Sequence, residues 1–138
     1  MQKITTRKIQ RILDANFNRA KEGLRVCEDI CRFLRDNERE TQKFKKIRHA
    51  LSAVMGRLML MALVESRDIK GDVGRSSTQA EFHRENDEDI LFANLQRVKE
   101  SLRVLEECLK LINRRGALNI KRLRYQVYAL EKEIVAEL

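Results

Sequence analysis

The chain has 138 residues, no proline, five glycines and a formal net charge of +8. This composition favours one nearly all-helical domain and argues against a β-sandwich or a βαβ fold. No apolar run approaches the ~20 residues that span a bilayer, and the N-terminus lacks the apolar core of a signal peptide, so we expect a soluble, cytoplasmic protein.

The first predicted element is a helix from about Arg7 to about Arg35. It carries one apolar heptad stripe, which is typical of a helix that packs into a bundle. The stripe consists of Ile9, Leu13, Phe17, Ala20, Leu24, Cys27, Cys31 and Leu34. Cys27 and Cys31 could face one metal ion, but Cys31 belongs to the stripe and no histidine is near it in the sequence. We therefore interpret both cysteines as buried, reduced thiols.

A second helix follows after a short turn and is expected to continue to about Val64. Asn37 and Glu40 have the spacing of a capping box and mark its start. Because a short connection makes two helices antiparallel neighbours, the chain from about residue 7 to residue 64 should form a helical hairpin.

The loop 65–86 is the only long stretch without helical periodicity. Loops of this length in compact domains are usually functional or disordered. We hypothesise that it is a lid and phosphate-binding element, because glycine N–H groups can converge on an anion and aspartates can hold Mg²⁺. The candidate residues are Arg67, Asp68, Gly71, Asp72, Gly74, Ser76 and Ser77. Asp72 is the candidate catalytic residue and magnesium ligand, with Asp68 as its substitute. The spacing is not that of a Walker A loop, and a merely solvated crossover loop stays open as the alternative.

The second half of the chain repeats the first. Residues 92–112 match residues 14–34 at nine identical positions without a gap, and residues 120–130 match residues 44–54. A duplicated supersecondary unit usually packs as pseudo-symmetric copies of itself. The chain should therefore contain two similar helical hairpins.

The repeat predicts a third helix from near Asp87 to the Asn113–Gly116 region, and a fourth from about Ala117 to the C-terminus. The predicted fold is all-α: a pseudo-two-fold four-helix bundle built from two repeated helical hairpins, with a long loop between helices 2 and 3. It forms a single domain, 1–138, whose second hairpin covers about 87–138.

Asparagine and arginine interrupt an apolar stripe at the same place in both copies. These residues are Asn16 and Arg19, and Asn94 and Arg97. Partly buried arginine costs free energy unless it is paired or liganded. In an up-down-up-down bundle the first and third helices both start at the end from which the loop 65–86 emerges, so both pairs should lie near that end. We therefore predict that they share one ligand cavity, with room left by Gly23 and Ser101. A structural network, in which the arginines pair with carboxylates such as Glu22 or Glu100, is the competing interpretation.

Arg48 and Arg124 form another repeated pair, one in the second helix of each hairpin. Guanidinium groups bind phosphate in a bidentate manner, so both residues are candidate phosphate ligands. An exposed arginine whose stem covers apolar surface is the competing interpretation for each of them.

Four stretches of the chain resemble a known family. They are RILDANFNRAKEGLRVCEDICRFL, ESRDIKGDVG, FANLQRVKESLRVLEECLK and LRYQVYALE, which together extend over about residues 10–132. They are similar to a small all-helical domain, found alone or fused ahead of thiamine phosphate synthase, whose members act as monofunctional kinases on hydroxymethylpyrimidine phosphate. The resemblance implies an ATP-dependent kinase that makes the diphosphate for thiamine biosynthesis, with ATP and Mg²⁺ as cofactors.

Two other functions compete with this one. The chain could be a non-catalytic interaction domain that partners thiamine phosphate synthase, or a basic helical module that binds nucleic acid, because a positive charge favours anionic partners. Most arginines alternate with acids or lie in apolar stripes, which disfavours nucleic acid. The expected partners are thus a pyrimidine phosphate and ATP, with thiamine phosphate synthase as a candidate and no membrane. A homo-oligomer stays open.

Overall fold

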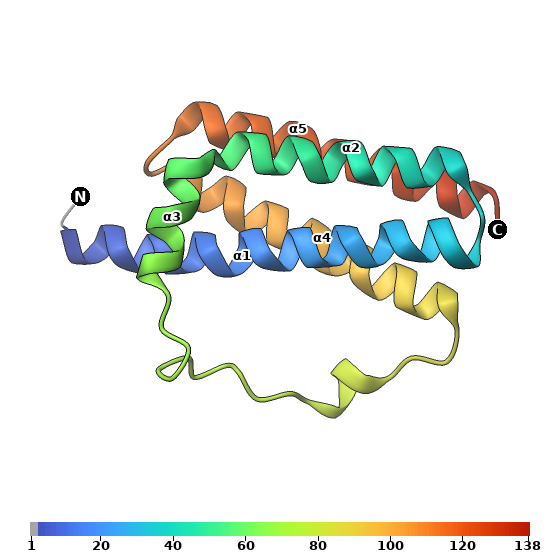
Figure 1. Ribbon diagram of the computed structural model, residues 1–138, viewed down its shortest axis with the longest axis horizontal. Coiled ribbons are helices and arrows are strands. Elements are labelled where there is room, and N and C mark those ends of the chain that lie inside the picture. The colour runs from blue at the N-terminus through green and yellow to red at the C-terminus, as the bar shows by residue number, and fades with distance from the viewer. Residues whose placement is uncertain (1–2) are drawn as a thin grey trace.

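The protein is all-helical in the computed structural model, which describes residues 3–138 (Figure 1). Its α-helices are α1 (Lys3–Asp29), α2 (Glu38–Met55), α3 (Arg57–Ser66), α4 (Asp87–Leu109) and α5 (Arg114–Ala136). A π-helical turn, η1 (Ile30–Leu34), extends α1, and a 3-10 turn, η2 (Gln79–Phe82), lies in the connection before α4. The four long helices form a bundle, which confirms the predicted fold class.

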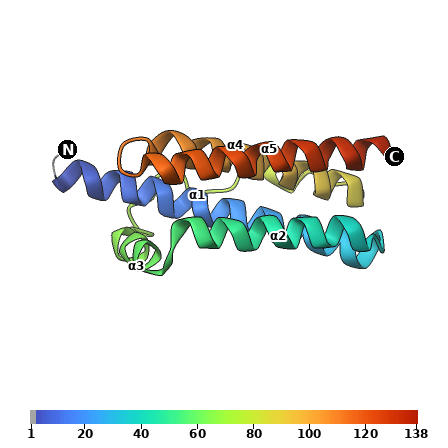
Figure 2. The ribbon, with the colours of Figure 1, turned by 90° about the horizontal axis from the view of Figure 1, so that it is seen from above.

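The two hairpins pack against each other through antiparallel helices. The main interface joins α1 to α4, where the Cys27 thiol donates a hydrogen bond to the carbonyl oxygen of Leu91 at 3.7 Å. On the other side of the bundle α2 lies along α5, and Lys43 Nζ is 2.7 Å from a carboxylate oxygen of Glu133. Figure 2 shows the long helices side by side, with α3 seen nearly end-on at the end of the bundle where the N-terminus lies.

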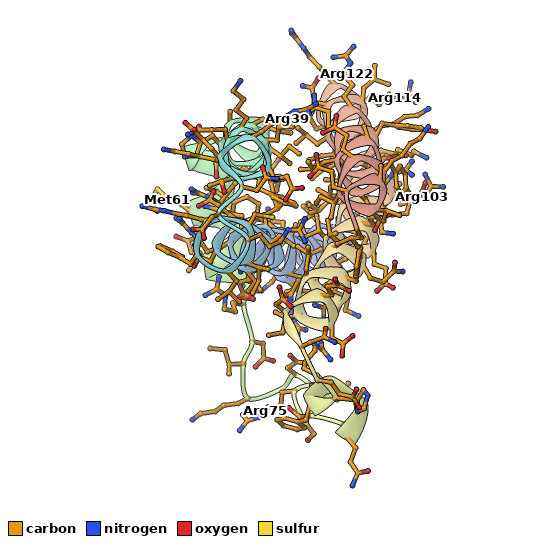
Figure 3. All side chains as sticks on the ribbon, turned by 90° about the vertical axis from the view of Figure 1, so that its right-hand side faces the viewer. Arg39, Met61, Arg75, Arg103, Arg114 and Arg122 are labelled. Carbon is orange, nitrogen blue, oxygen red and sulfur yellow. The ribbon has the colours of Figure 1, made fainter. Side chains whose placement is uncertain are left out.

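α4 begins at the end of the bundle opposite to the start of α1, so the expectation that both start at the same end is wrong (Figure 1). The reason is the path of residues 67–86, called here the crossover segment, which runs along the bundle before α4 begins. An extended chain of this length can reach ~60 Å, which exceeds the ~40 Å length of α1. Figure 3 shows Arg75 on this segment, away from the bundle.

The predicted second helix is broken into α2 and α3 by Gly56, so residues 3–138 contain five α-helices rather than four. Gly56 has a φ of 68° and a ψ of 157°, a combination that glycine adopts far more readily than other residues. α3 then packs on α1, with Leu63 buried. The boundary between α4 and α5 also differs from the prediction, because α5 starts at Arg114 and not near Ala117.

Asparagine side chains cap three of the helices. The Asn37 side chain accepts a hydrogen bond from the backbone N–H of Glu40 at 2.9 Å, as the capping-box spacing predicts. Asn86 caps α4 and Asn113 caps α5 in the same way, each through the third residue that follows it. Each such cap typically contributes ~1 kcal/mol, so the repeated asparagines define where three helices begin.

The predicted heptad stripe of α1 forms the centre of the core. Leu13, Ala20, Leu24, Cys27 and Cys31 are all fully buried. Both thiols are free, as predicted, and desolvation by burial raises the pKa of Cys31 to about 12. The final member of the stripe, Leu34, is instead 60% exposed. A π-helical turn holds more residues than an α-helical turn, so the stripe leaves the core-facing side within η1.

Gly23 sets the close approach of α1 to α4. A Cβ atom at this position would lie 2.7 Å from Val98 Cγ2 and 3.2 Å from the carbonyl oxygen of Asn94. The expectation that Gly23 leaves room for a ligand is therefore wrong, because the side chain of Val98 fills that space. Its counterpart Ser101 is buried and donates a hydrogen bond to the carbonyl oxygen of Arg97 at 2.6 Å.

Within residues 3–138, no single helix is both long and apolar enough to cross a membrane. In the part of the chain that the structure describes, one bent pair, α2 with Met59–Ser66 of α3, reaches that length and composition.

Candidate functional site

Two cavities lie beside α1, one near each end of the crossover segment. The first loop cavity measures about 590 Å³ and lies between the N-terminal half of α1 and residues 67–72. The second loop cavity measures about 450 Å³ and lies between the C-terminal part of α1, the middle of α4, and Glu81 and Arg84 of the crossover segment. The crossover segment therefore contributes side chains to both cavities.

The first loop cavity brings together five of the predicted site residues, which come from α1 and from the start of the crossover segment. These are Asn16, Arg19, Arg67, Asp68 and Asp72. The same cavity contains Lys8, Arg11 and Asp14, which the sequence analysis missed. Helical spacing could have found them, because positions 8, 11, 15 and 19 follow one face of α1.

Asp14 and Arg67 hold the start of the crossover segment against α1. Arg67 Nε and Nη2 donate hydrogen bonds to Asp14 Oδ2 and Oδ1 at 2.7 and 2.8 Å. The Asp14 side chain is 9% exposed and also accepts a bond from Asn18 at 3.3 Å. The hydrogen bond to this carboxylate raises the pKa of Arg67, so the guanidinium stays charged. The pair forms one wall of the cavity.

Asn16 has the same local geometry as its repeat counterpart Asn94. Each amide nitrogen donates to the carbonyl oxygen four residues earlier, at 2.9 Å in Asn16 and 2.8 Å in Asn94. The Oδ1 atom of Asn16 accepts a bond from Arg19 Nη1 at 3.4 Å. Asn16 is buried, whereas Arg19 and Arg97 are exposed, so the expectation of partly buried arginines is wrong. The two arginines lie at the bundle surface, where water can solvate them.

The two asparagine–arginine pairs line different cavities, contrary to the expectation of a shared one. Asn16 and Arg19 line the first loop cavity, and Asn94 and Arg97 line the second. The antiparallel packing of α1 on α4 causes this separation, because it moves the start of α4 to the other end of the bundle. The second loop cavity also contains Glu22 and Glu100, so its walls are more acidic.

The glycines of the crossover segment form local turns. Gly71 N–H donates to Asp68 Oδ1 at 2.8 Å, and Gly74 N–H donates to Asp72 Oδ1 at 2.9 Å. Aspartates of the same segment thus accept hydrogen bonds from these N–H groups, a contact that is common in turns. Neither glycine has a positive φ. Ser76 and Ser77 are exposed and line neither loop cavity.

Arg48 and Arg124 form two equivalent buried ion pairs away from both loop cavities. Arg48 Nη2 lies 3.3 Å from Glu28 Oε1, and Arg124 Nε lies 3.0 Å from Glu106 Oε1. Although burial alone lowers it, the pKa of Arg124 is raised by hydrogen bonds to Glu106 and Tyr128. The expectation that these arginines help at the cavity of Asn16 is therefore wrong. The competing interpretation of exposed arginines is wrong as well, because both side chains are largely buried.

A magnesium site at Asp72 stays a prediction. Across the described residues 3–138, no group of three or more His, Cys, Asp or Glu side chains gathers around one point. Asp68 and Asp72 do line the same cavity. One or two carboxylates together with water and phosphate oxygens are the usual ligands of Mg²⁺ in proteins, so this pair suits such an ion.

The chain matches the model of the ThiD2 family over residues 11–133. It is 43% identical over 136 residues to a thiamine-phosphate synthase of Synechocystis sp., covering 98% of this chain and 38% of the synthase. Similar proteins of the same name come from Rhodopirellula baltica, at 39% identity over 94% of this chain and 35% of the synthase, and Nostoc punctiforme, at 41% over 92% and 35%. The chain thus spans about a third of the length of these relatives. No solved structure matches it.

These relatives contradict the expectation that the chain is an ATP-dependent hydroxymethylpyrimidine phosphate kinase. Proteins 35–43% identical to it over most of its length are named thiamine-phosphate synthase, and none of those named above is called a kinase. The coarser part of the resemblance is supported, since the same helical domain occurs in chains that carry the synthase name.

Proposed function

The chain belongs to the ThiD2 family, and from this premise we propose that it is a ligand-binding domain of thiamine biosynthesis that works together with thiamine-phosphate synthase. The support is the domain content of the relatives, in which nearly the whole of this chain corresponds to about a third of a protein of that name. Two activities joined in one chain usually act on the same pathway. A separate copy of the domain would then act beside the synthase as its partner.

The first loop cavity is the proposed ligand site, and its unpaired cations are the observation that carries the proposal. Lys8, Arg11 and Arg19 all line it, and none of them forms an ion pair within the described part of the chain. A phosphate group could therefore bind these cations without breaking an existing pair. Charge-assisted hydrogen bonds of this kind are the strongest that side chains offer to phosphate.

A phosphorylated hydroxymethylpyrimidine suits the remaining walls of this cavity. Ile12 and Ile69 are 40% and 65% exposed and offer apolar surface to a flat ring. The carboxylates of Asp68 and Asp72 can accept hydrogen bonds from an amino group on the ring. Pockets for small molecules combine such apolar surface with a few polar groups. ATP and Mg²⁺ at this cavity stay predictions.

The proposal is tested by titrating hydroxymethylpyrimidine phosphate into the purified chain, with heat or NMR shifts as the readout. Arg19→Gln removes one cation from the first loop cavity, and we expect it to weaken binding ~10-fold or more, because a hydrogen bond to a charged group contributes ~1.5–3 kcal/mol. Arg97→Gln is the matched control. It makes the same change at the repeat counterpart in the second loop cavity, and it should leave the affinity nearly unchanged.

Three results would contradict the proposal. One is the absence of saturable binding, and another is an equal loss of affinity in the two variants. The third is product formation by the isolated chain with the pyrimidine phosphate, ATP and Mg²⁺, since this would make the domain an enzyme in its own right. The proposed association with thiamine-phosphate synthase is measured by titrating the chain with the synthase from the same cell. A result of no detectable association would contradict that part of the proposal.

A further inference from the structure

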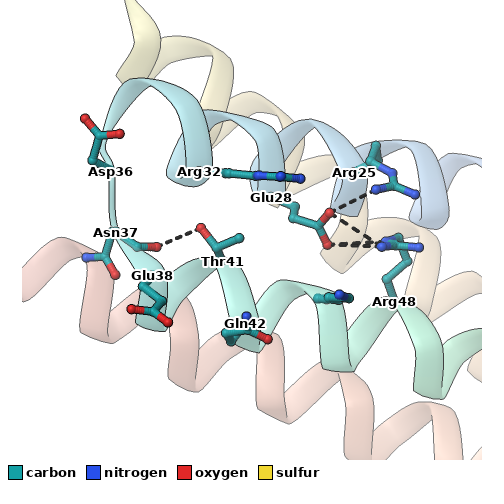
Figure 4. Close-up of a pocket in the computed structure, with 10 residues that line it drawn as sticks. Arg25, Glu28, Arg32, Asp36, Asn37, Glu38, Thr41, Gln42 and Arg48 are labelled. Atoms are coloured by element: carbon teal, nitrogen blue, oxygen red, sulfur yellow. Dashed lines mark hydrogen bonds and ion pairs between the residues drawn. The ribbon is translucent and has the colours of Figure 1, made fainter.

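We propose that the groove between α1 and α2 is a second anion site, which binds the phosphate group of a small polar molecule independently of the first loop cavity. The groove, called here the hairpin pocket, measures about 490 Å³ and lies between the end of α1 with η1 and the first half of α2. Figure 4 shows the carboxylate of Glu28 joined to Arg25 and Arg48, and Arg32 lines the same pocket. Lys45 also lines the hairpin pocket.

Glu28 forms ion pairs with two of these cations, Arg25 and Arg48. Its side chain is 4% exposed and lies 3.0 Å from Arg25 Nη1 and 3.3 Å from Arg48 Nη2. A carboxylate held by two guanidinium groups fixes both of them and leaves one positive charge uncompensated. Arginine restrained in this way loses less side-chain freedom when it binds an anion.

The second hairpin provides an internal comparison, because it repeats the same ion pairs. Arg103 and Arg124 contact Glu106 there, at 2.7 and 3.0 Å. In that copy Arg124 Nη1 also donates to the hydroxyl of Tyr128 at 3.1 Å, so its free edge is occupied. The counterpart of Tyr128 is Ser52, whose hydroxyl donates instead to the carbonyl oxygen of Arg48.

The free edge of Arg48 therefore faces the hairpin pocket. Only its Nε and Nη2 atoms bond to Glu28, and no buried side-chain nitrogen in the described residues lacks a partner, so Nη1 is open to solvent. The aromatic rings of Tyr125 and Tyr128 lie against Arg124, with centroids 5.3 and 5.6 Å from its guanidinium carbon. The counterparts of these tyrosines in the first copy are His49 and Ser52, and no ring contact of Arg48 is found among the described residues. In the second copy two tyrosines contact the arginine, whereas in the first copy the arginine lines a pocket.

Two further cations complete the anion site. Arg32 and Lys45 line the hairpin pocket and form no ion pair within residues 3–138. Asp36 lies in the turn between η1 and α2, Glu38 is the first residue of α2, and both line the pocket as well. Thr41 and Gln42 supply neutral polar groups to the rest of the wall. This arrangement suits a phosphate at the arginine end and a hydrogen-bonding, uncharged remainder, as in a phosphate monoester of a small polar metabolite.

The experiment uses ¹⁵N-labelled full-length chain titrated with inorganic phosphate and with a sugar phosphate, with amide NMR shifts as the readout. Arg32→Gln with Lys45→Gln removes the two unpaired cations and leaves the Glu28 pairs intact. We expect the shifts of amides in residues 25–48 to saturate in the wild-type chain and the affinity there to fall at least tenfold in the double variant. The matched control is Lys110→Gln with Lys121→Gln, which removes the same charge from the counterpart positions and should retain binding.

A second variant closes the pocket without removing a charge. Ser52→Tyr places a phenol where Tyr128 stands in the other copy, so it should satisfy Arg48 and abolish the phosphate-dependent shifts while the helical circular dichroism persists. Unchanged shifts in both the double and the tyrosine variant would overturn the site, and so would an absence of shifts around residues 25–48 in the wild-type chain. Binding near residues 8–19 and 67–72 is read in the same spectra. The same experiment can therefore contradict the first loop cavity as a binding site while it supports the hairpin pocket, or contradict the hairpin pocket while it supports the first loop cavity.

Discussion

At the scale of single residues, the contact between Asp14 and Arg67 does most to shape the first loop cavity. Arg67 ends α3 and starts the crossover segment, and its two hydrogen bonds to Asp14 join that point to α1. Asp14 is buried. A side chain at this position that could not form the ion pair would leave the Arg67 guanidinium without its two hydrogen-bond acceptors. The geometry of the cavity thus depends on a residue that is itself in the cavity wall.

Replacing Asp14 with Asn should lower the free energy of unfolding by ~1–2 kcal/mol, because it removes the charge from a largely buried, bidentate pair. The same change should speed amide hydrogen exchange at residues 67–72, since the start of the crossover segment loses its attachment. Chemical denaturation and exchange measured by NMR check both effects. Glu22→Gln, an exposed change on the same helix, is the control. Exchange at 67–72 that is equally slow in both variants would show that the segment is held by other contacts.

At the scale of the elements, the packing of α1 on α4 decides where every candidate residue lies. At Gly23 of α1 the side chain of Val98 on α4 leaves no room for a side chain. Because the helices are antiparallel, repeat-related residues move apart along the bundle axis on either side of this point. Asn16 and Asn94 consequently belong to different cavities.

Gly23→Ala should destabilise the protein by ~1–3 kcal/mol, because the added methyl group would overlap Val98 and press on the backbone of α4. Ser101→Ala is the natural comparison, since Ser101 occupies the counterpart position and its hydroxyl bonds only within its own helix. That variant should change the unfolding free energy by less than ~1 kcal/mol. Thermal and urea unfolding measure the difference. Equal effects of the two substitutions would mean that the helices can separate at no cost.

Several elements were predictable because short-range chemistry defines them. The asparagine at position 37 begins α2 through a bond to a residue only three positions away, and the heptad stripe of α1 requires only helical periodicity. Gly56 breaks its helix through its own dihedral angles, yet a lone glycine within an apolar run is also tolerated inside helices. The sequence pattern alone therefore did not reveal α3 as a separate helix.

At the scale of the whole molecule, the two hairpins are joined by a covalent connection that contributes little to the core. The crossover segment is exposed over residues 67–79, with Val73 fully so. The bundle is held instead by the contacts of α1 with α4 and of α2 with α5. The connection shapes the loop cavities, whereas helix packing provides the stability.

Brief trypsin treatment should cut the chain after Lys70 or Arg75, because both residues lie in this exposed segment. The bundle should stay folded after the cut, because the hairpins bury each other's apolar faces. Two fragments should appear on a denaturing gel, while size-exclusion chromatography shows one species with unchanged helical circular dichroism. Fragments that separate under native conditions would show that the segment is needed to hold the halves together. The nicked protein should also lose affinity for the pyrimidine phosphate, because residues 67–72 are no longer restrained on one side.

Sequence patterns alone predicted a helical, duplicated protein with a capping asparagine at position 37, and they named Asn16, Arg19, Arg67, Asp68 and Asp72 as candidates, which line one cavity in the structure. Each of those inferences rests on periodicity or on residue chemistry, which act over a few positions. The three-dimensional fold was needed to show that α4 runs opposite to α1, that Arg48 and Arg124 form ion pairs with Glu28 and Glu106, and that Lys8 and Arg11 line the same cavity. These features depend on the direction in which a 20-residue crossover segment carries the chain, and no local pattern encodes that direction.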